Sequence, residues 1–248
     1  MFDEAKYVQN SFNLVFPRQP EIRRKANDFE DSLRGRYVQP QIIAVPDELD
    51  PEVPRIIFGS QHGFSQVIIS QVNLVLNVTY SPDWQTDISK GRQYLLERTS
   101  VLYDLLEVLG EVRPLFCGLT TRARLRTSQR EAAVLKALAD LFMKSLPKPR
   151  PFDIEVKTVT AHSGRFFSNM MVRNYCKWNM DARQIAVPRF PRGQCSERGI
   201  EVIGDFNDRY AYNEHTDYHS SREVAPKVIE GGLREMKTMI EKIRGARS

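Results

Sequence analysis

Cysteine is scarce in this sequence, and the three cysteines that are present lie far apart. Cys117, Cys176 and Cys195 show no CxxC spacing. Disulfide frameworks and zinc ribbons need regularly spaced cysteines, so the sequence excludes both. The same scarcity is typical of proteins in a reducing compartment, and we expect a cytoplasmic location.

Long hydrophobic runs and catalytic signatures are also missing. No apolar run approaches the roughly 20 residues that span a bilayer, so we expect no membrane contact. The N-terminal stretch MFDEAKYVQN carries two acids and no apolar segment, so we expect no secretory signal. GxSxG, P-loop and GxGxxG motifs are absent. The sequence therefore leaves the catalytic residues unknown, and we expect no cofactor.

The overall composition is that of a globular protein. Of the 248 residues, 41% are hydrophobic and 27% are charged, which suits one large domain or two small ones. The formal net charge of +5 is mild. It permits an anionic partner but does not require one.

The clearest structural pattern is QVIISQVNLVLNVTY, residues 66 to 80. From Val72 onward apolar and polar residues alternate, which predicts a half-buried strand, because successive strand side chains face opposite sides of a sheet. The residues expected to face the core are Val72, Leu74, Leu76, Val78 and Tyr80; Asn73, Asn77 and Thr79 are expected to face away, and Val75 is the exception.

The other elements come as runs of strands that are each followed by a long helix. We expect strands at 11–16, 41–45 and 199–206, hairpins at 55–61/64–70 and 152–162/165–178, and a strand at 112–125. We expect helices at 20–35, 87–109, 128–146 and from 220–226 to about 244. This order favours an α+β fold with antiparallel sheets, each covered by long helices. It also suggests two loosely similar halves, residues 1–146 and 147–248, within what could be one continuous domain.

Two local signals lie in the predicted helices. Ser128 and Glu131 match the S-x-x-E capping box, which predicts the start of the helix at 128–146. Gly231 and Gly232 interrupt the last helix. Because glycine costs about 1 kcal/mol against alanine in a helix, they predict a weak point there.

One stretch resembles a known family. The succession of a hairpin, VNLVLNVTYSPDW, a long helix and VRPLFCGLTTRARL is similar to a sporadically distributed prokaryotic protein family of about this size. The likeness covers mainly residues 55–126. It rests on Asn77, Tyr80, Trp84, Gly118 and Leu119. That family is uncharacterised, so the resemblance implies a fold and a prokaryotic cytoplasmic origin but supplies no catalytic residues.

A cluster of acids and histidines lies between Asp205 and His219, in DFNDRYAYNEHTDYH. Imidazole and carboxylate groups together suit zinc, manganese or iron. On an extended strand, His215, Asp217 and His219 would share one face. The alternative is a polar loop, which is rich in Asp, Asn and His for turn reasons alone. The metal hypothesis would use Asp205, Asp208, His215, Asp217 and His219.

A row of arginines follows one face of the strand at 112–125. Arg122, Arg124 and Arg126 are two residues apart, so their guanidinium groups stand roughly 6.8 Å apart and can bind successive phosphates or carboxylates. The alternative, which we favour, is a solvated face paired with acids of the preceding helix. Those acids are Glu97, Asp104 and Glu107.

The strand RFFSNMMVRNYCKW, residues 165–178, has one face that is typical of core. The other face interleaves aromatic and basic side chains, Phe167, Arg173, Tyr175 and Lys177. Such a face can stack bases and hold phosphates. It marks a protein interface at least as often. The irregular segment 179–198 that follows is also basic.

These patterns favour a non-catalytic binding protein or accessory subunit of a prokaryotic complex. The expected partner is another protein or a second copy of the chain, and nucleic acid is the second candidate. The expected binding residues are Arg122, Arg124, Arg126, Phe167, Arg173, Tyr175 and Lys177. The opposing hypothesis is a metal-dependent hydrolase or nuclease built on the Asp205–His219 cluster.

Overall fold

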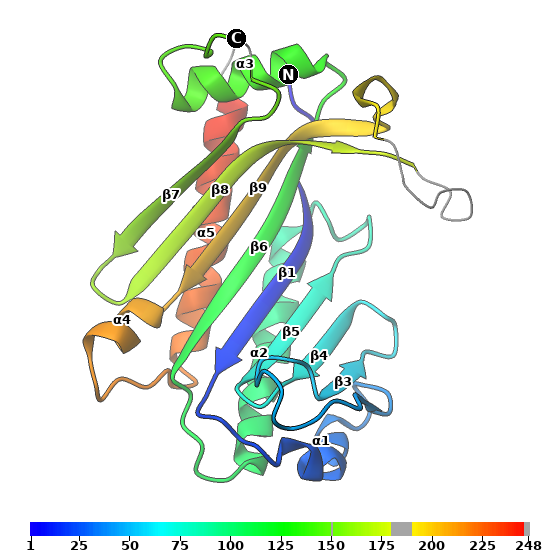
Figure 1. Ribbon diagram of the computed structural model, residues 1–248, viewed down its shortest axis with the longest axis vertical. Helices are drawn as coiled ribbons and strands as arrows, with labels where there is room; N and C mark the ends of the chain where they lie inside the picture. Colours follow the sequence, from blue (N-terminus) through cyan, green and yellow to red (C-terminus); the bar gives the residue numbers. More distant parts are fainter. Residues whose placement is uncertain (150, 180–189, 246–248) are drawn as a thin grey trace.

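A computed structural model describes residues 1–149, 151–179 and 190–245 (Figure 1). Residues 180–189 of the basic segment at 179–198 therefore lie outside the described residues. Nine strands in the described part form one antiparallel sheet in the order β2-β3-β4-β5-β1-β6-β9-β8-β7. The strands are β1 (Lys6–Val15), β2 (Gln41–Ile42), β3 (Ile56–Gly59), β4 (Ser65–Ile69), β5 (Asn73–Thr79), β6 (Phe116–Arg126), β7 (Glu155–His162), β8 (Phe166–Lys177) and β9 (Glu197–Asn207).

The two longest helices lie on one face of this sheet. The helices are α1 (Ala26–Leu33), α2 (Ile88–Val108), α3 (Glu131–Phe142), α4 (Arg209–Glu214) and α5 (Val224–Gly245), with short 3-10 turns η1 (Ile22–Lys25) and η2 (Arg192–Gln194). Figure 1 shows α2 and α5 side by side behind the sheet; α5 packs on β6 and β9, and α2 packs on β1 and β5. No helix in the described part of the chain combines the length and the hydropathy needed to cross a membrane.

The alternation in residues 66–80 predicts β5 correctly. Leu74, Leu76 and Val78 are buried against the helix layer, whereas Asn73 and Asn77 are half-buried on the other face. The same parity governs β1 and β6, where Phe12 and Leu119 pair with each other and are buried. Period-2 patterning thus directs one face of every central strand into the core.

The predicted α+β class with antiparallel pairing is confirmed, but the expectation of separate sheets is wrong. One sheet runs through the whole chain, because β6 from the first half pairs along its length with β9 from the second half. From this pair β1, β5, β4 and β3 extend to one side, with β2 at the edge, and β8 and β7 extend to the other. Pairing the two runs removes two exposed edges. The division at residues 146 and 147 remains a prediction.

The capping box predicted at Ser128 does not form. α3 begins at Glu131, and its N-cap residue, Arg130, provides no side-chain hydrogen bond. The hydroxyl of Thr127 instead accepts a hydrogen bond from the backbone N–H of Gln129 at 3.1 Å and donates one to the carbonyl of Met1 at 2.9 Å. The turn before α3 is therefore organised by Thr127, and the helix starts later than the sequence signal predicts.

Gly231 and Gly232 are sites of close packing within a continuous α5, so they do not break the helix, and their cost against alanine remains a prediction. A Cβ on Gly231 would lie 2.5 Å from the ring of Phe206, and one on Gly232 would lie 3.2 Å from Leu119. Real Cβ atoms essentially never come as close as 2.5 Å, so glycine at position 231 lets α5 lie this near to β9.

Candidate functional site

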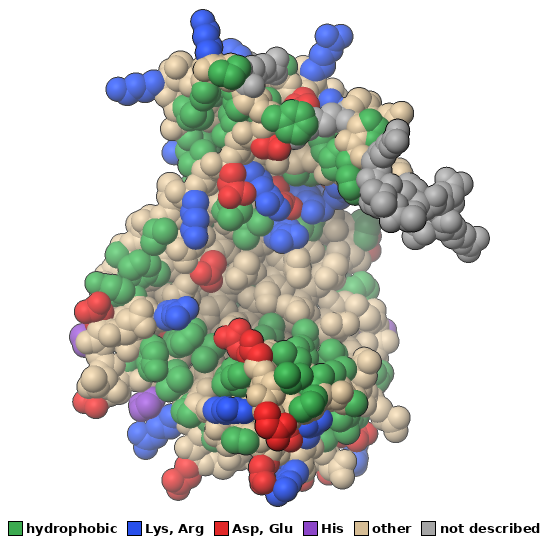
Figure 2. Space-filling view, viewed as in Figure 1, with side chains coloured by type: hydrophobic (Ala, Val, Ile, Leu, Met, Phe, Trp, Pro, Cys, Tyr) green, Lys and Arg blue, Asp and Glu red, His purple; other side chains and the backbone are tan. Residues whose placement is uncertain are grey.

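The face of the sheet opposite α2 and α5, here called the open face, carries no helix layer in the described structure (Figure 1). Strand register places its side chains in rows. Ser11, Thr120, Asp205 and Asn169 form one row from β1 to β8. Figure 2 shows that the centre of this face is hollowed and largely free of charged or hydrophobic side chains. The uncharged polar residues that follow from the register are Gln9, Ser11, Asn13, Asn77, Thr120, Asn169 and Asn207, here called the polar floor.

Charged side chains gather at one end of the open face, around the carboxylate of Glu201. This β9 residue is only 2% exposed and pairs with Arg124 on β6 and Arg173 on β8. Arg124 Nε donates to Glu201 Oε1 at 2.9 Å, and Arg173 Nη2 donates to Oε2 at 2.7 Å. Arg122 Nε lies farther away, 3.9 Å from Oε1. These four residues are here called the Glu201 cluster. Figure 2 shows Lys or Arg and Asp or Glu side chains gathered above the hollow.

The Glu201 cluster is held together by charge. Burial alone would raise the pKa of Glu201, but hydrogen bonds from Arg173 and Arg124 outweigh it, and the pKa lies below its ordinary value. The hydrogen bond to Glu201 likewise raises the pKa of Arg173. The carboxylate is therefore ionised at neutral pH, and it fixes two guanidinium groups in place.

Tyr175 and Lys177 extend this cluster toward the end of β8. The Tyr175 hydroxyl donates to Glu197 at 2.8 Å, and Lys177 Nζ lies 3.1 Å from the same carboxylate. Burial, and then the bond to Glu197, raise the pKa of Tyr175. The guanidinium of Arg124 lies over its ring, 5.3 Å from the centroid, and the residue is 9% exposed. The ring that was predicted to stack on bases is thus largely covered.

The structure brings together five of the seven expected binding residues: Arg122, Arg124, Arg173, Tyr175 and Lys177. Arg126 is exposed at the end of β6 and forms no ion pair with another described residue. Phe167 lies at the opposite end of β8, against Tyr210.

The helix acids expected to neutralise the arginine row are not its partners, because α2 lies on the other face of the sheet. Asp104 and Glu107 pair with Arg222, and Glu97 accepts a hydrogen bond from Gln93. The arginines find Glu201 on the neighbouring strand instead. The expected acid pairing is present for Arg124, but the acid is Glu201 of β9 and not a residue of α2.

The residues of the metal hypothesis do not form one site. Asp205 lies on the open face, whereas Asp208 is buried on the opposite side, where it accepts from the Cys117 backbone N–H at 2.6 Å. α4 follows immediately and ends at Glu214, and residues 215–219 form a turn and irregular backbone instead of the extended strand expected to align His215, Asp217 and His219; all three are exposed. Within residues 1–149, 151–179 and 190–245, no three His, Cys, Asp or Glu side chains are grouped as metal ligands.

Asp208 instead joins the segment after α4 to β6. Its second carboxylate oxygen accepts from the Tyr218 hydroxyl at 2.7 Å, while the Ser220 hydroxyl donates to Cys117 Sγ at 3.2 Å. Burial raises the pKa of Asp208. Burial, and then the nearby Asp208 charge, raise the pKa of the Cys117 thiol. A buried thiol with a raised pKa is a poor nucleophile, so this cluster is structural.

A polar pocket of about 190 Å³ opens on the open face beside α4, here called the Asp205 pocket. It is lined by Phe167, Asn169, Asp205, Asn207, Arg209, Tyr210 and Asn213. Sequence analysis singled out only Phe167 and Asp205 among them. Asn169 and Asn207 could have been found from their positions on the same strand faces as these two, but α4, which supplies Arg209 and Tyr210, is too short to show helical periodicity.

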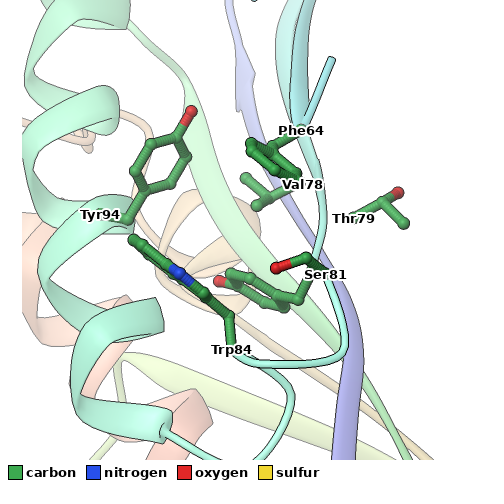
Figure 3. Close-up of a pocket in the computed structure, with 7 residues that line it drawn as sticks. Phe64, Val78, Thr79, Ser81, Trp84 and Tyr94 are labelled. Carbon is green, nitrogen blue, oxygen red and sulfur yellow. The ribbon is translucent and has the colours of Figure 1, made fainter. Parts of the chain in front are cut away.

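A second pocket lies in the helix layer, between the end of β5 and the start of α2 (Figure 3). Its walls are mainly Phe64, Val78, Tyr80, Trp84 and Tyr94, and its volume is about 70 Å³. The rings of Trp84 and Tyr94 meet edge to face, with centroids 6.1 Å apart. An apolar space of this size fits one side chain, well below the roughly 300 Å³ of a drug-sized site.

Comparison with known proteins gives no relative: no family model, no curated protein and no solved structure matches this chain. The resemblance over residues 55–126 therefore remains a prediction. Two of its residues have packing roles here: Tyr80 accepts a hydrogen bond from Asn10 at 2.8 Å, and Trp84 packs on Tyr94. The fold and its open face define an α+β protein with one uncovered sheet surface, and function has to be inferred from that surface.

Proposed function

We propose that the protein is a non-catalytic binding protein, an accessory subunit of a cytoplasmic prokaryotic complex, which docks another protein on its open face. The observation that supports this is the nine-stranded sheet with its two long helices on one side and a hollow on the other (Figures 1 and 2). A rigid sheet holds side chains in fixed rows, which suits recognition of a macromolecular surface.

The chemistry of the open face favours a protein partner over nucleic acid. Glu201 already neutralises Arg124 and Arg173, and Glu155 lies 3.6 Å from Arg173 as well. Phosphate binding needs cations that are not already paired in this way. The polar floor offers both donors and acceptors, and half-buried Met171 and Ile203 lie beside it. This mixture of polar and apolar groups is typical of non-obligate protein interfaces.

The opposing hypothesis, a metal-dependent hydrolase or nuclease, has less support. It requires Asp205 and Asp208 to act on one ion, but these residues lie on opposite sides of the sheet. Their hydrogen-bond partners are amides, a hydroxyl and a backbone N–H of the same chain.

Position-specific photo-cross-linking in prokaryotic cells that express the chain would test the proposal. A photoreactive residue at Thr120, exposed in the polar floor, should give a discrete cross-linked species. The same residue at Lys237, exposed on α5, is the matched control and should not. The same pattern from both positions, or none from Thr120, would contradict docking on the open face.

Nucleic acid can be tested separately with the purified protein. We expect no binding of single-stranded or duplex oligonucleotides at micromolar protein and low salt. Binding that falls steeply as salt rises, and that weakens in Arg122→Ala plus Arg173→Ala, would make nucleic acid the partner of this face instead.

A further inference from the structure

We propose that the Asp205 pocket binds a sugar ring through its vicinal diol. This goes beyond the docking of a protein partner, since it assigns a small-molecule site at one end of the open face. The pocket volume of about 190 Å³ is below the range of drug-sized sites, which starts near 300 Å³, and suits a single ring.

The floor of the pocket is a carboxylate held in a fixed orientation. Asp205 Oδ2 accepts hydrogen bonds from the side-chain amides of Asn169 and Asn207, both at 2.9 Å. Asn207 is itself fixed, because its Oδ1 accepts from the backbone N–H of Arg209 at 3.2 Å. Orientation of a ligand-binding group by its neighbours lowers the entropy lost on binding.

The second oxygen of Asp205 is left for a ligand. No hydrogen bond from another described residue reaches Oδ1. The neighbouring β6 position is Gly118, where a Cβ would lie 3.6 Å from Oδ1 and 3.0 Å from the Cβ of Asn207. Glycine there leaves the space beside Oδ1 open. Burial raises the pKa of Asp205, while hydrogen bonds from Asn169 and Asn207 oppose that shift. In its ionised form the carboxylate accepts hydrogen bonds only, so its complement is a hydroxyl or amine donor.

Aromatic rings form the apolar wall. The centroids of Phe167 and Tyr210 are 4.5 Å apart, and their planes are tilted by 41°. The guanidinium of Arg209 lies over the ring of Phe116 at 5.4 Å, which positions this charge at the rim. A sugar ring presents C–H groups on one face and hydroxyls around its edge. It can therefore pack on these rings while one hydroxyl donates to Asp205 and its neighbour accepts from the Asn213 amide, which also lines the pocket.

Other ligand classes fit the pocket less well. Calcium and magnesium take six or more oxygen ligands, commonly from several carboxylates, whereas Asp205 is the only acid among the described residues that line this pocket. A nucleobase would need a free slot between aromatic rings, but Phe167 and Tyr210 already contact each other. The vicinal diol is shared by free saccharides and by the ribose of a ribonucleotide, and binding experiments can separate these two sources.

Ligand-observed NMR and calorimetry on the full chain would test the site with defined probes. The probes are ribose 5-phosphate, 2-deoxyribose 5-phosphate, glucose and mannose, each up to about 10 mM, because single-ring ligands often bind near 1 mM. Binding of ribose 5-phosphate but not its 2-deoxy analogue would indicate a ribonucleotide. Binding of glucose or mannose would indicate a saccharide. Binding of none of the four, or equal binding of the two pentose phosphates with no hexose binding, would overturn the proposal.

Two variants locate the binding. Asp205→Asn keeps the shape and removes the charge, and should weaken binding about tenfold or more. Tyr210→Leu removes one ring of the aromatic wall and leaves the carboxylate in place, so it provides the test if Asp205→Asn folds poorly. Asp217→Asn, exposed outside the pocket, is the matched control and should bind as the wild type does. Unchanged affinity in both pocket variants would overturn the assignment.

The sugar site and protein docking can fail independently. The cross-linking experiment changes Thr120, which does not line the Asp205 pocket, and adds no sugar. A negative sugar titration therefore does not affect the docking result. A negative cross-linking result likewise leaves any measured sugar affinity standing.

Discussion

Glu201 is the central acid of the Glu201 cluster, because its buried carboxylate accepts hydrogen bonds from both Arg124 and Arg173. Glu201→Gln keeps the shape but leaves both guanidinium groups without their ionised acceptor. We expect the free energy of unfolding at pH 7 to fall by about 1–3 kcal/mol, less than for a fully buried pair, because the arginines are partly exposed. Glu155→Gln, which removes a longer and exposed ion pair to Arg173, should change it by less than about 1 kcal/mol.

The pH dependence of the Glu201→Gln effect gives a second measurement. The pKa of Glu201 is lowered in the folded protein, so its ionised form stabilises the fold above the ordinary Glu pKa of about 4.3. This contribution is lost as the pH falls through the folded pKa. Urea unfolding should show the full difference between wild type and variant at pH 7 and a shrinking one below about pH 4. A difference that is constant with pH would contradict the ionised cluster.

Leu76 tests the strand register at the level of one side chain. It is 0% exposed, so Leu76→Asp would bury an unpaired carboxylate at a cost of several kcal/mol. We expect loss of soluble expression, whereas Asn77→Asp, on the half-buried open side of β5, should express. Normal thermal stability of Leu76→Asp would show that the register is wrong.

For single residues, the sequence predicts which side chains are buried better than it predicts which side chains contact each other. Alternation alone places Leu74, Leu76 and Val78 in the core, because each strand carries its own period. It cannot pair Arg124 with Glu201, which lies 77 residues away, because that contact depends on which strands become neighbours. The same limit hides the link between Asp205 and Asn169.

Among the elements, α5 is the one whose position depends most on its glycines. Helix propensity alone predicts that Gly231→Ala stabilises the protein by up to about 1 kcal/mol. The structure predicts the opposite sign, since the new Cβ would lie 2.5 Å from Phe206 and overpacking costs about 1–3 kcal/mol. We expect lower stability in chemical denaturation, partly restored by adding Phe206→Leu.

An exposed position of the same helix provides the control for Gly231→Ala. Thr238 lies on the solvent side of α5, and Thr238→Ala should be neutral or slightly stabilising. If Gly231→Ala stabilises to the same extent, α5 does not approach β9 as closely as described.

Elements with strong periodicity, such as α2 and β5, are predictable from sequence, and weakly marked ones are not. α4 has only six residues, and its tyrosines and asparagine read equally well as a loop. The metal hypothesis assumes an extended strand at 215–219, where the structure has a turn and irregular backbone. The unrecognised α4 concealed the wall of the Asp205 pocket. α3 begins late because Thr127, rather than Ser128, organises the preceding turn.

For the molecule as a whole, the join between β6 and β9 decides the architecture. Each half of the chain contributes a run of strands and a long helix, and local patterns show both runs. Whether the runs make two sheets or one depends on a pairing between residues far apart in the sequence, such as Leu119 and Phe206, which no local pattern reports. The open face exists because the joined sheet has its two long helices on the same side.

This join predicts that the chain unfolds as one unit. β6 pairs with β1 on one side and with β9 on the other, so neither run can unfold without exposing the buried face of its neighbour. The sequence has two tryptophans, one in each half. In a Trp178→Phe variant the fluorescence of Trp84 reports on the first run of strands, and in a Trp84→Phe variant the fluorescence of Trp178 reports on the second. We expect their fluorescence transitions in urea to coincide with each other and with the loss of circular dichroism. Two separated midpoints would instead support independent halves, because a continuous sheet couples the regions around both tryptophans through the same central pair of strands.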